Sequence, residues 1–160
     1  MRTSVVTDVI VVGAGIVGAS VAYHAARGGA AVVLLDRSVP ASGVTGDSFA
    51  WIRGTNGEAD GSTPLRRTVL ADWARLEREV PGIRVRWTGS LTWGGQTPSD
   101  MGELGSDERL VEADEIARLE PNLRASPQRA VFRPADGAID AVAVTEALVD
   151  ALGATVRKYC

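Results

Sequence analysis

The sequence predicts an α/β protein that begins with a parallel sheet and continues into part of a second domain with a mixed or antiparallel sheet. Three observations indicate this fold class. Asp8 and an apolar run at 9–12 lead into a glycine turn at 13–18, a second apolar run at 31–35 ends in Asp36, and an alternation of apolar and arginine residues starts at Ile83. The first two observations describe a βαβ unit of the Rossmann-like kind, and the third is typical of a half-buried strand.

The glycine turn has the residues expected of a phosphate-binding loop. Gly13 permits the tight turn, Gly15 lacks a Cβ so that a pyrophosphate can approach the backbone, and Gly18 lets the helix pack close to the strand. The N–H groups at the start of the helix, together with its positive end, then face the phosphates. We expect the strand at 8–12 to be buried in a parallel sheet.

Asp36, at the end of the second apolar run, is placed to accept hydrogen bonds from a ribose hydroxyl, and its charge would repel a 2′-phosphate. This spacing of strand, helix, strand and acid predicts that the chain binds an adenine dinucleotide. The alternative is a glycine-rich turn that binds no ligand. The residues predicted to form the ADP side of the site are Gly13, Gly15, Ile16, Val17, Gly18, Asp36 and Arg37.

The composition is that of an ordinary globular protein of 160 residues, with 45% hydrophobic and 23% charged residues. A net charge of −3 gives no electrostatic reason to expect nucleic acid or an anionic membrane as a partner. The sequence shows no secretory signal and no membrane-spanning run of about 20 apolar residues, so we expect a cytoplasmic protein.

The chain has one cysteine, Cys160, and one histidine, His24. A disulfide within the chain is therefore impossible, and the sequence predicts neither a zinc site nor a Ser/His/Asp triad. His24 falls on the helix after the glycine turn, where we expect it to be solvated or to pack against neighbours.

The middle of the chain is expected to begin with a long loop over residues 37–60, interrupted by the apolar group at 49–52. Thr63 is a candidate N-cap for a helix that carries Pro64 in its first turn and ends at Pro81 and Gly82. The alternation over 83–93 then predicts either a hairpin or two sequential strands.

Shorter elements are expected in the last third of the chain. A polar connection covers 94–105, a short helix covers 114–119, and a short strand contains Val131 and Phe132. Asp140 is a candidate N-cap for a helix that ends at Gly153. Residues 154–159 then predict the start of a strand with no element after it, which is typical of an incomplete fold.

Taken together, these segments resemble the FAD-dependent oxidoreductases of the D-amino acid oxidase (glycine/sarcosine oxidase-like) family. The matching segments are the glycine turn with Asp36, the loop at 42–52, and the segments 87–93, 115–121, 136–140 and 153–156. The resemblance implies FAD as cofactor and transfer of a hydride from an amino acid or other amine to the flavin. It covers only the N-terminal portion of such proteins, and it implies an incomplete FAD-binding domain (1–82 and 140–160) with a partial substrate domain (83–139).

The loop at 42–52 resembles the flavin-contacting loop of this family. Its small and hydroxyl-bearing residues permit close backbone approach and hydrogen bonds to the cofactor. The cofactor residues predicted from it are Gly43, Val44, Thr45, Ser48 and Phe49. Asp47 departs from the neutral residue expected by resemblance, so we expect it to point to solvent.

Phe49, Trp51 and Arg53 each allow two interpretations. Phe49 and Trp51 either wall the flavin or substrate cavity or are plain hydrophobic packing. Arg53 either holds a substrate carboxylate through a bidentate pair or is a surface arginine. No residue of the chain is identified as a catalytic base.

Two further classes of function stay open. The glycine turn with Asp36 also permits an NAD-dependent dehydrogenase. The third possibility is a non-catalytic fragment, or one subunit of a split flavoenzyme that a second chain completes. Because much of the cavity around the flavin would come from sequence outside this segment, we expect the isolated chain not to turn over an amine.

Overall fold

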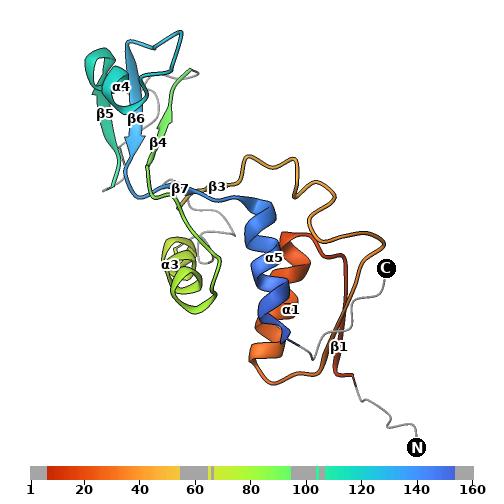
Figure 1. Ribbon diagram of the computed structural model, residues 1–160. Coiled ribbons are helices and arrows are strands. Elements are labelled where there is room, and N and C mark those ends of the chain that lie inside the picture. Colours follow the sequence, from red (N-terminus) through yellow and green to blue (C-terminus); the bar gives the residue numbers. More distant parts are fainter. Residues whose placement is uncertain (1–6, 55–64, 66, 95–103, 105–106, 154–160) are drawn as a thin grey trace, which may run out of the picture. The chain divides into compact units, whose positions relative to one another are not determined.

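The computed structural model describes residues 7–54, 65, 67–94, 104 and 107–153. Its described residues contain helices together with one parallel sheet and two antiparallel sheets, which confirms the predicted fold class. The described chain divides into two compact units (Figure 1). The first combines residues 7–50, 74–85 and 139–153, and the second combines the described residues between 51 and 73 with those between 86 and 138.

The first unit contains the βαβ element. Strand β1 (Val9–Val12) leads through the glycine turn into helix α1 (Ile16–Arg27), and strand β2 (Val32–Leu35) follows. The two strands pair in parallel, with Val9 opposite Val32 and Val12 opposite Leu35. This is the arrangement that the spacing of the two apolar runs predicted.

The burial of β1 differs from the prediction. Ile10 is 63% exposed and Val12 is 81% exposed, whereas Val32 and Leu34 of β2 are buried. Successive side chains of a strand point to opposite faces, and α1 lies against only one of them. Within the described residues, the expectation of a fully buried β1 is therefore wrong, because the face that carries Ile10 and Val12 is open.

Helix α5 (Ala141–Ala151) packs along α1 in the same unit (Figure 1). The Asp140 carboxylate accepts a hydrogen bond from the Ala143 N–H at 3.0 Å, so Asp140 is the N-cap that the sequence predicted. Gly153 follows the helix with φ of +62°, a backbone conformation that glycine adopts without strain.

Helix α3 spans Val69–Glu79. The helix predicted over this region is confirmed, and it ends before Gly82, whose φ is +96°. The predicted start at Thr63 and Pro64 lies outside the described residues, as do most of the connection at 94–105 and the predicted strand at 154–159.

The second unit contains an antiparallel sheet in the order β4 (Ser90–Thr92), β6 (Arg129–Arg133), β5 (Arg109–Glu112). Helix α4 (Ala113–Leu119) follows β5 directly. The core of this sheet consists of Val111, Ile116, Ala130 and Phe132, with Leu91 and Leu123 packed against it. The short helix and the strand at Val131 and Phe132 are confirmed, while β5 was not predicted.

A hairpin within 83–93 does not form. Ile83 and Val85 are buried and Arg84 and Arg86 are exposed, as the alternation predicted, but the partners come from far along the chain. Strand β4 pairs with β6, and Arg86 forms a bridge with Ala138. Ala138 belongs to β7 (Gly137–Ala138), which also pairs antiparallel with β3 (Trp51–Ile52).

Candidate functional site

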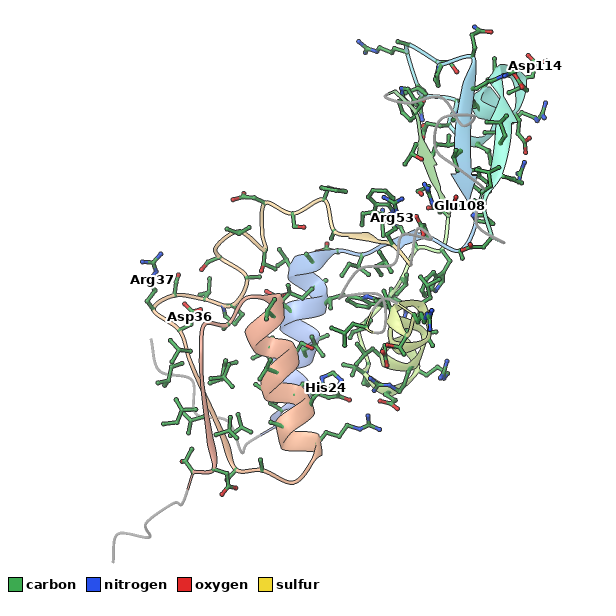
Figure 2. The ribbon with its side chains drawn as sticks, turned by 180° about the vertical axis from the view of Figure 1, so that it is seen from behind. His24, Asp36, Arg37, Arg53, Glu108 and Asp114 are labelled. Carbon is green, nitrogen blue, oxygen red and sulfur yellow. The ribbon has the colours of Figure 1, made fainter. Side chains whose placement is uncertain are left out.

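The first unit contains a cavity of about 450 Å³ beside the N-terminus of α1. Two segments form it: the glycine turn and the chain that follows β2. The residues that line the cavity are Gly15, Asp36, Arg37, Ser38, Ala41, Ser42, Gly43, Val44 and Thr45. Figure 2 marks Asp36 and Arg37 at the end of β2, with the exposed Arg37 side chain directed away from the ribbon.

Backbone geometry explains the glycines of the turn. Gly13 has φ of +103°, which side-chain-bearing residues rarely adopt. A Cβ on Gly18 would lie 1.9 Å from the Gly13 carbonyl oxygen, so only glycine permits this contact between helix and turn. A Cβ on Gly15 would lie 3.0 Å from Thr45 Oγ1, and its absence leaves the backbone accessible from the cavity.

Asp36 connects the end of β2 to the glycine turn. Its Oδ2 accepts a hydrogen bond from the Ala14 N–H at 2.6 Å, and its Oδ1 accepts one from the Ser38 N–H at 2.9 Å. These bonds, the one from Ala14 above all, hold the pKa of the Asp36 carboxyl below its ordinary value. The carboxylate is thus kept ionised at the edge of the cavity, where it can accept further hydrogen bonds from hydroxyl groups.

The residue at the N-cap of α1 provides no side-chain acceptor for the N–H groups of the first turn. Gly15 is the N-cap and makes no side-chain cap bond, and the first turn of the helix carries no acidic residue. The Thr45 Oγ1 instead accepts a hydrogen bond from the Ile16 N–H at 3.1 Å, across 29 positions of sequence. The cavity therefore lies at a helix N-terminus, which attracts anions, and the first N–H of this helix donates to the uncharged Thr45 hydroxyl.

The structure brings six of the predicted cofactor residues to this cavity: Gly15, Asp36, Arg37, Gly43, Val44 and Thr45. Gly13, Ile16 and Gly18 shape the turn and the first residues of α1 behind it. Val17 is 75% exposed on α1 and does not line the cavity. Ser48 and Phe49 also lie outside the lining. The Ser48 Oγ accepts a hydrogen bond from Ala50 N–H, and Phe49 is 82% exposed.

The cofactor residues predicted from the sequence did not include Ala14, Ser38, Ala41 or Ser42. Ala41 has φ of +61°, an unusual conformation for alanine, and its N–H donates to the Ala14 carbonyl at 3.0 Å. Ala14 thus joins the loop and Asp36 through its two backbone groups. Nothing in the sequence signals Ala41, since alanine is not a residue that favours a left-handed backbone. Asp47 is exposed, as predicted.

Trp51 and Arg53 belong to the second unit. The Trp51 indole Nε1–H donates to Asp136 Oδ2 at 3.1 Å, and the Arg53 guanidinium lies over the Trp51 ring with Cζ 5.1 Å from its centre. Arg53 is half-buried, and Figure 2 marks its position. Both interpretations of Arg53, as a carboxylate-binding residue and as a surface arginine, stay predictions.

His24 belongs to a polar cluster on the surface of the first unit. Its Nδ1 lies 2.8 Å from the Ser20 carbonyl oxygen, and its Nε2 lies 3.2 Å from Arg75. Glu79 pairs with both Arg27 and Arg75 beside it. Within the part of the chain that the structure describes, no cluster of His, Cys, Asp and Glu could hold a metal ion. No helix among the described residues is long and apolar enough to cross a membrane.

Comparison with known proteins gives the class to which this fold and cavity belong. Residues 8–160 match the model of the DAO family, described as FAD dependent oxidoreductase. Because the match covers nearly the whole sequence, the chain belongs to this family of FAD-dependent oxidoreductases.

Individual relatives agree with this assignment. The chain is 30% identical to a glycine oxidase of Bacillus licheniformis over an aligned length of 168, and the match covers 95% of this chain and 45% of that protein. It is 29% identical to the monomeric sarcosine oxidase of Bacillus sp. (strain B-0618), with 95% and 43% covered. The structure of glycine oxidase from Bacillus cereus ATCC 14579 has the same fold, with a TM-score of 0.77 at 23% identity over 96% of this chain and 46% of that chain.

The chain spans a little under half the length of the relatives that it matches. The residues present in the first unit fit the cofactor that names the family. The cavity offers an accessible backbone at Gly15, a helix end without its own acidic residue, and the ionised Asp36 carboxylate. These groups match the chemistry of a pyrophosphate and a ribose.

Proposed function

We propose that this chain is the FAD-binding part of an FAD-dependent oxidoreductase that oxidises an amino acid or another small amine. The observation that carries the proposal is the cavity between the N-terminus of α1 and the segment after β2, which contains Gly15, Asp36 and Thr45. The pyrophosphate is proposed to lie against the helix end and the ribose against Asp36. When bound, the flavin supplies the acceptor for a hydride from the carbon–nitrogen bond of the substrate.

The substrate class is inferred from the relatives and from one side chain. The two curated relatives are called glycine oxidase and sarcosine oxidase, both named for small amino acids. Arg53 is the residue proposed to hold the substrate carboxylate, because its guanidinium is half-buried and rests on the Trp51 ring. A guanidinium in such a place offers two parallel donors to a carboxylate.

We propose that one part of the chain binds FAD and that another part contributes to the substrate site. Residues 1–82 and 140–160 form the FAD-binding domain, and residues 83–139 contribute to the substrate domain. The nine proposed cofactor residues near the glycine turn and cavity are Gly13, Gly15, Ile16, Gly18, Asp36, Arg37, Gly43, Val44 and Thr45. Val17, Ser48 and Phe49 are kept as contacts with parts of FAD outside the cavity. We place the protein in the cytoplasm.

A further polypeptide segment is proposed to complete the FAD-binding domain. Ile10 and Val12 of β1 present apolar side chains that are mostly exposed, and apolar faces of parallel sheets are normally covered on both sides. The relatives are more than twice as long as the matched segment. Whether that segment is part of the same chain or a second chain is tested by adding a polypeptide that corresponds to the remainder of such a relative.

A binding titration tests the cofactor proposal. The purified chain is titrated with FAD, and the change in flavin absorbance and in tryptophan fluorescence is followed. We expect saturable binding, competition by ADP, and weaker binding of NAD⁺ than of FAD. Tighter binding of NAD⁺ would favour a nicotinamide-dependent dehydrogenase, and no binding of either would contradict a dinucleotide site.

A further inference from the structure

Asp136 is a buried carboxylate in the second unit, at 2% exposure. It lies between β6 and β7, where its backbone N–H donates to the Arg133 carbonyl and its backbone carbonyl accepts from the Gly89 N–H. These two bonds shape the turn and require no particular side chain. The carboxylate therefore has a separate role, since a charge is buried only where partners compensate for its lost hydration.

The partners of that carboxylate come from two distant segments. Its Oδ2 accepts a hydrogen bond from the Trp51 Nε1–H at 3.1 Å and another from the Ser90 hydroxyl at 2.7 Å. Trp51 is 85 positions away in sequence and Ser90 is 46 positions away. Bonds to an ionised acceptor are stronger and more directional than those between neutral groups, so the indole ring is fixed at its edge.

The face of the same indole carries Arg53. The guanidinium carbon lies 5.1 Å from the ring centre, within the range in which a cation is attracted to an aromatic face. Because Trp51 and Ile52 pair with Ala138 and Gly137, the backbone before Arg53 is held by the strand that directly follows Asp136. Carboxylate, indole and guanidinium thus form one continuous series of contacts.

We propose that Asp136 is a positioning residue, which orients Trp51 and, through the indole, the guanidinium of Arg53. The inference rests on the proposed role of Arg53 toward a substrate carboxylate, and it adds a cause for the placement of that guanidinium over the indole ring. An arginine that must meet both oxygens of a carboxylate benefits from a fixed plane, because less rotamer freedom is lost on binding.

The first test measures the link between Asp136 and Trp51 directly. The chain has four tryptophans, so a ¹⁵N spectrum of the full chain contains four indole N–H signals, and Trp51→Phe identifies the one from Trp51. We expect Asp136→Asn to move that signal, because a neutral amide oxygen is a weaker acceptor than a carboxylate. Asp114→Asn is the matched control, since Asp114 is an exposed carboxylate of the same unit. An unmoved Trp51 signal in Asp136→Asn would overturn the proposal.

The second test measures the effect on Arg53 with acetate as the probe. The Nε–H signal of Arg53, identified with Arg53→Lys, is followed while acetate is added to the wild-type chain and to each variant. We expect saturable movement in the wild type and in Asp114→Asn, and at least about threefold weaker acetate binding in Asp136→Asn. Equal acetate affinity in Asp136→Asn and the wild type would show that Asp136 does not act on Arg53.

A double variant separates positioning from general stability. If Asp136 acts through the indole, Asp136→Asn will weaken acetate binding no further in a Trp51→Phe background. Additive losses would instead indicate two independent effects and contradict the proposal. If Asp136→Asn fails to fold, Trp51→Phe still tests the step through the indole, because it leaves the carboxylate in place and must weaken acetate binding. Wild-type acetate affinity in Trp51→Phe would overturn the proposal. An Arg53 signal that never responds to acetate would refute the carboxylate role of Arg53, whereas the indole signal would still report on Asp136 and Trp51.

Discussion

The carboxylate of Asp36 accepts a hydrogen bond of 2.6 Å from the backbone N–H of Ala14, 22 positions earlier in the chain. This bond joins the end of β2 to the middle of the glycine turn, and Ala41 closes the same region through the Ala14 carbonyl. The acid that the sequence assigned to a ribose thus also maintains the shape of the loop that would receive the phosphates. Its two roles can be separated by experiment.

Replacement of Asp36 is expected to weaken FAD binding. In Asp36→Asn the side chain keeps its size but loses the negative charge that favours ribose hydroxyl donors, so we expect about a tenfold rise in the dissociation constant for FAD. A fluorescence titration measures it. Asp47→Asn serves as the control, because Asp47 is an exposed carboxylate of the neighbouring loop and its removal should leave the affinity unchanged. Equal affinity in Asp36→Asn and the wild type would contradict the ribose assignment.

The same residue predicts how stability depends on pH. The pKa of Asp36 is lowered in the folded chain by the N–H groups of Ala14 and Ser38, relative to its ordinary value of 3.8. The stability that follows is fully present above about pH 3.8 and is lost as the pH falls through the lower folded-state pKa. Urea unfolding measured between neutral pH and pH 3 should show a smaller acid loss for Asp36→Asn than for the wild type. Parallel curves for the two proteins would refute this contribution.

Gly18→Ala is expected to disrupt the first unit. The added Cβ would lie 1.9 Å from the Gly13 carbonyl oxygen, and two backbone segments would have to separate to admit it. We expect a loss of at least about 3 kcal/mol in the free energy of unfolding, measured by urea denaturation. Gly43→Ala is the matched control, because a Cβ there meets no atom within 4 Å. A Gly18→Ala variant as stable as Gly43→Ala would show that the turn and helix are not in this contact.

Thr45 is expected to stabilise α1 in the free chain. When FAD binds, a phosphate oxygen is expected to replace the Thr45 hydroxyl as the acceptor of the Ile16 N–H. Thr45→Val removes the acceptor of the Ile16 N–H, which should destabilise the free chain by about 1 kcal/mol, whereas Thr45→Ser should keep most of the stability. If a phosphate oxygen accepts the same N–H, saturating FAD will raise the melting temperature of Thr45→Val more than that of the wild type. An identical FAD-induced shift in both would argue that the phosphate does not meet Ile16.

The buried ion pair of the second unit gives a further stability prediction. Arg133 Nε lies 2.6 Å from Glu108 Oε1, with the two side chains only 4% and 8% exposed, and Arg133 also donates to the Thr92 hydroxyl. Glu108→Leu leaves the guanidinium without its carboxylate and should cost about 3–5 kcal/mol. Adding Arg133→Met should recover much of that loss, as thermal unfolding would show. A Glu108→Leu variant that is as stable as the wild type would mean that the Arg133 guanidinium is not left buried without a partner.

The sequence by itself determined those helices, strands and caps that are specified by residues close together in the chain. Two apolar runs with a glycine turn between them predicted β1, α1 and β2, and Asp140 predicted the cap of α5, because each signal lies within a few residues of the structure that it specifies. The acid after β2 and the loop residues 43–45 were likewise assigned to the candidate site from sequence, and both line the cavity.

Outside the βαβ element, tertiary structure alone decided which strands pair and which side chains meet. The alternation marked buried and exposed positions correctly over 83–86, whereas Trp87 of the same pattern is 39% exposed. Strand β4 pairs with β6 and not within a hairpin, because register depends on partners that local sequence does not name. The same holds for Asp136 with Trp51, for Thr45 with Ile16, and for the left-handed Ala41. Periodicity and turn residues report only on the nearest neighbours of each residue, whereas a site is assembled from groups that are far apart in the chain and are brought together by packing.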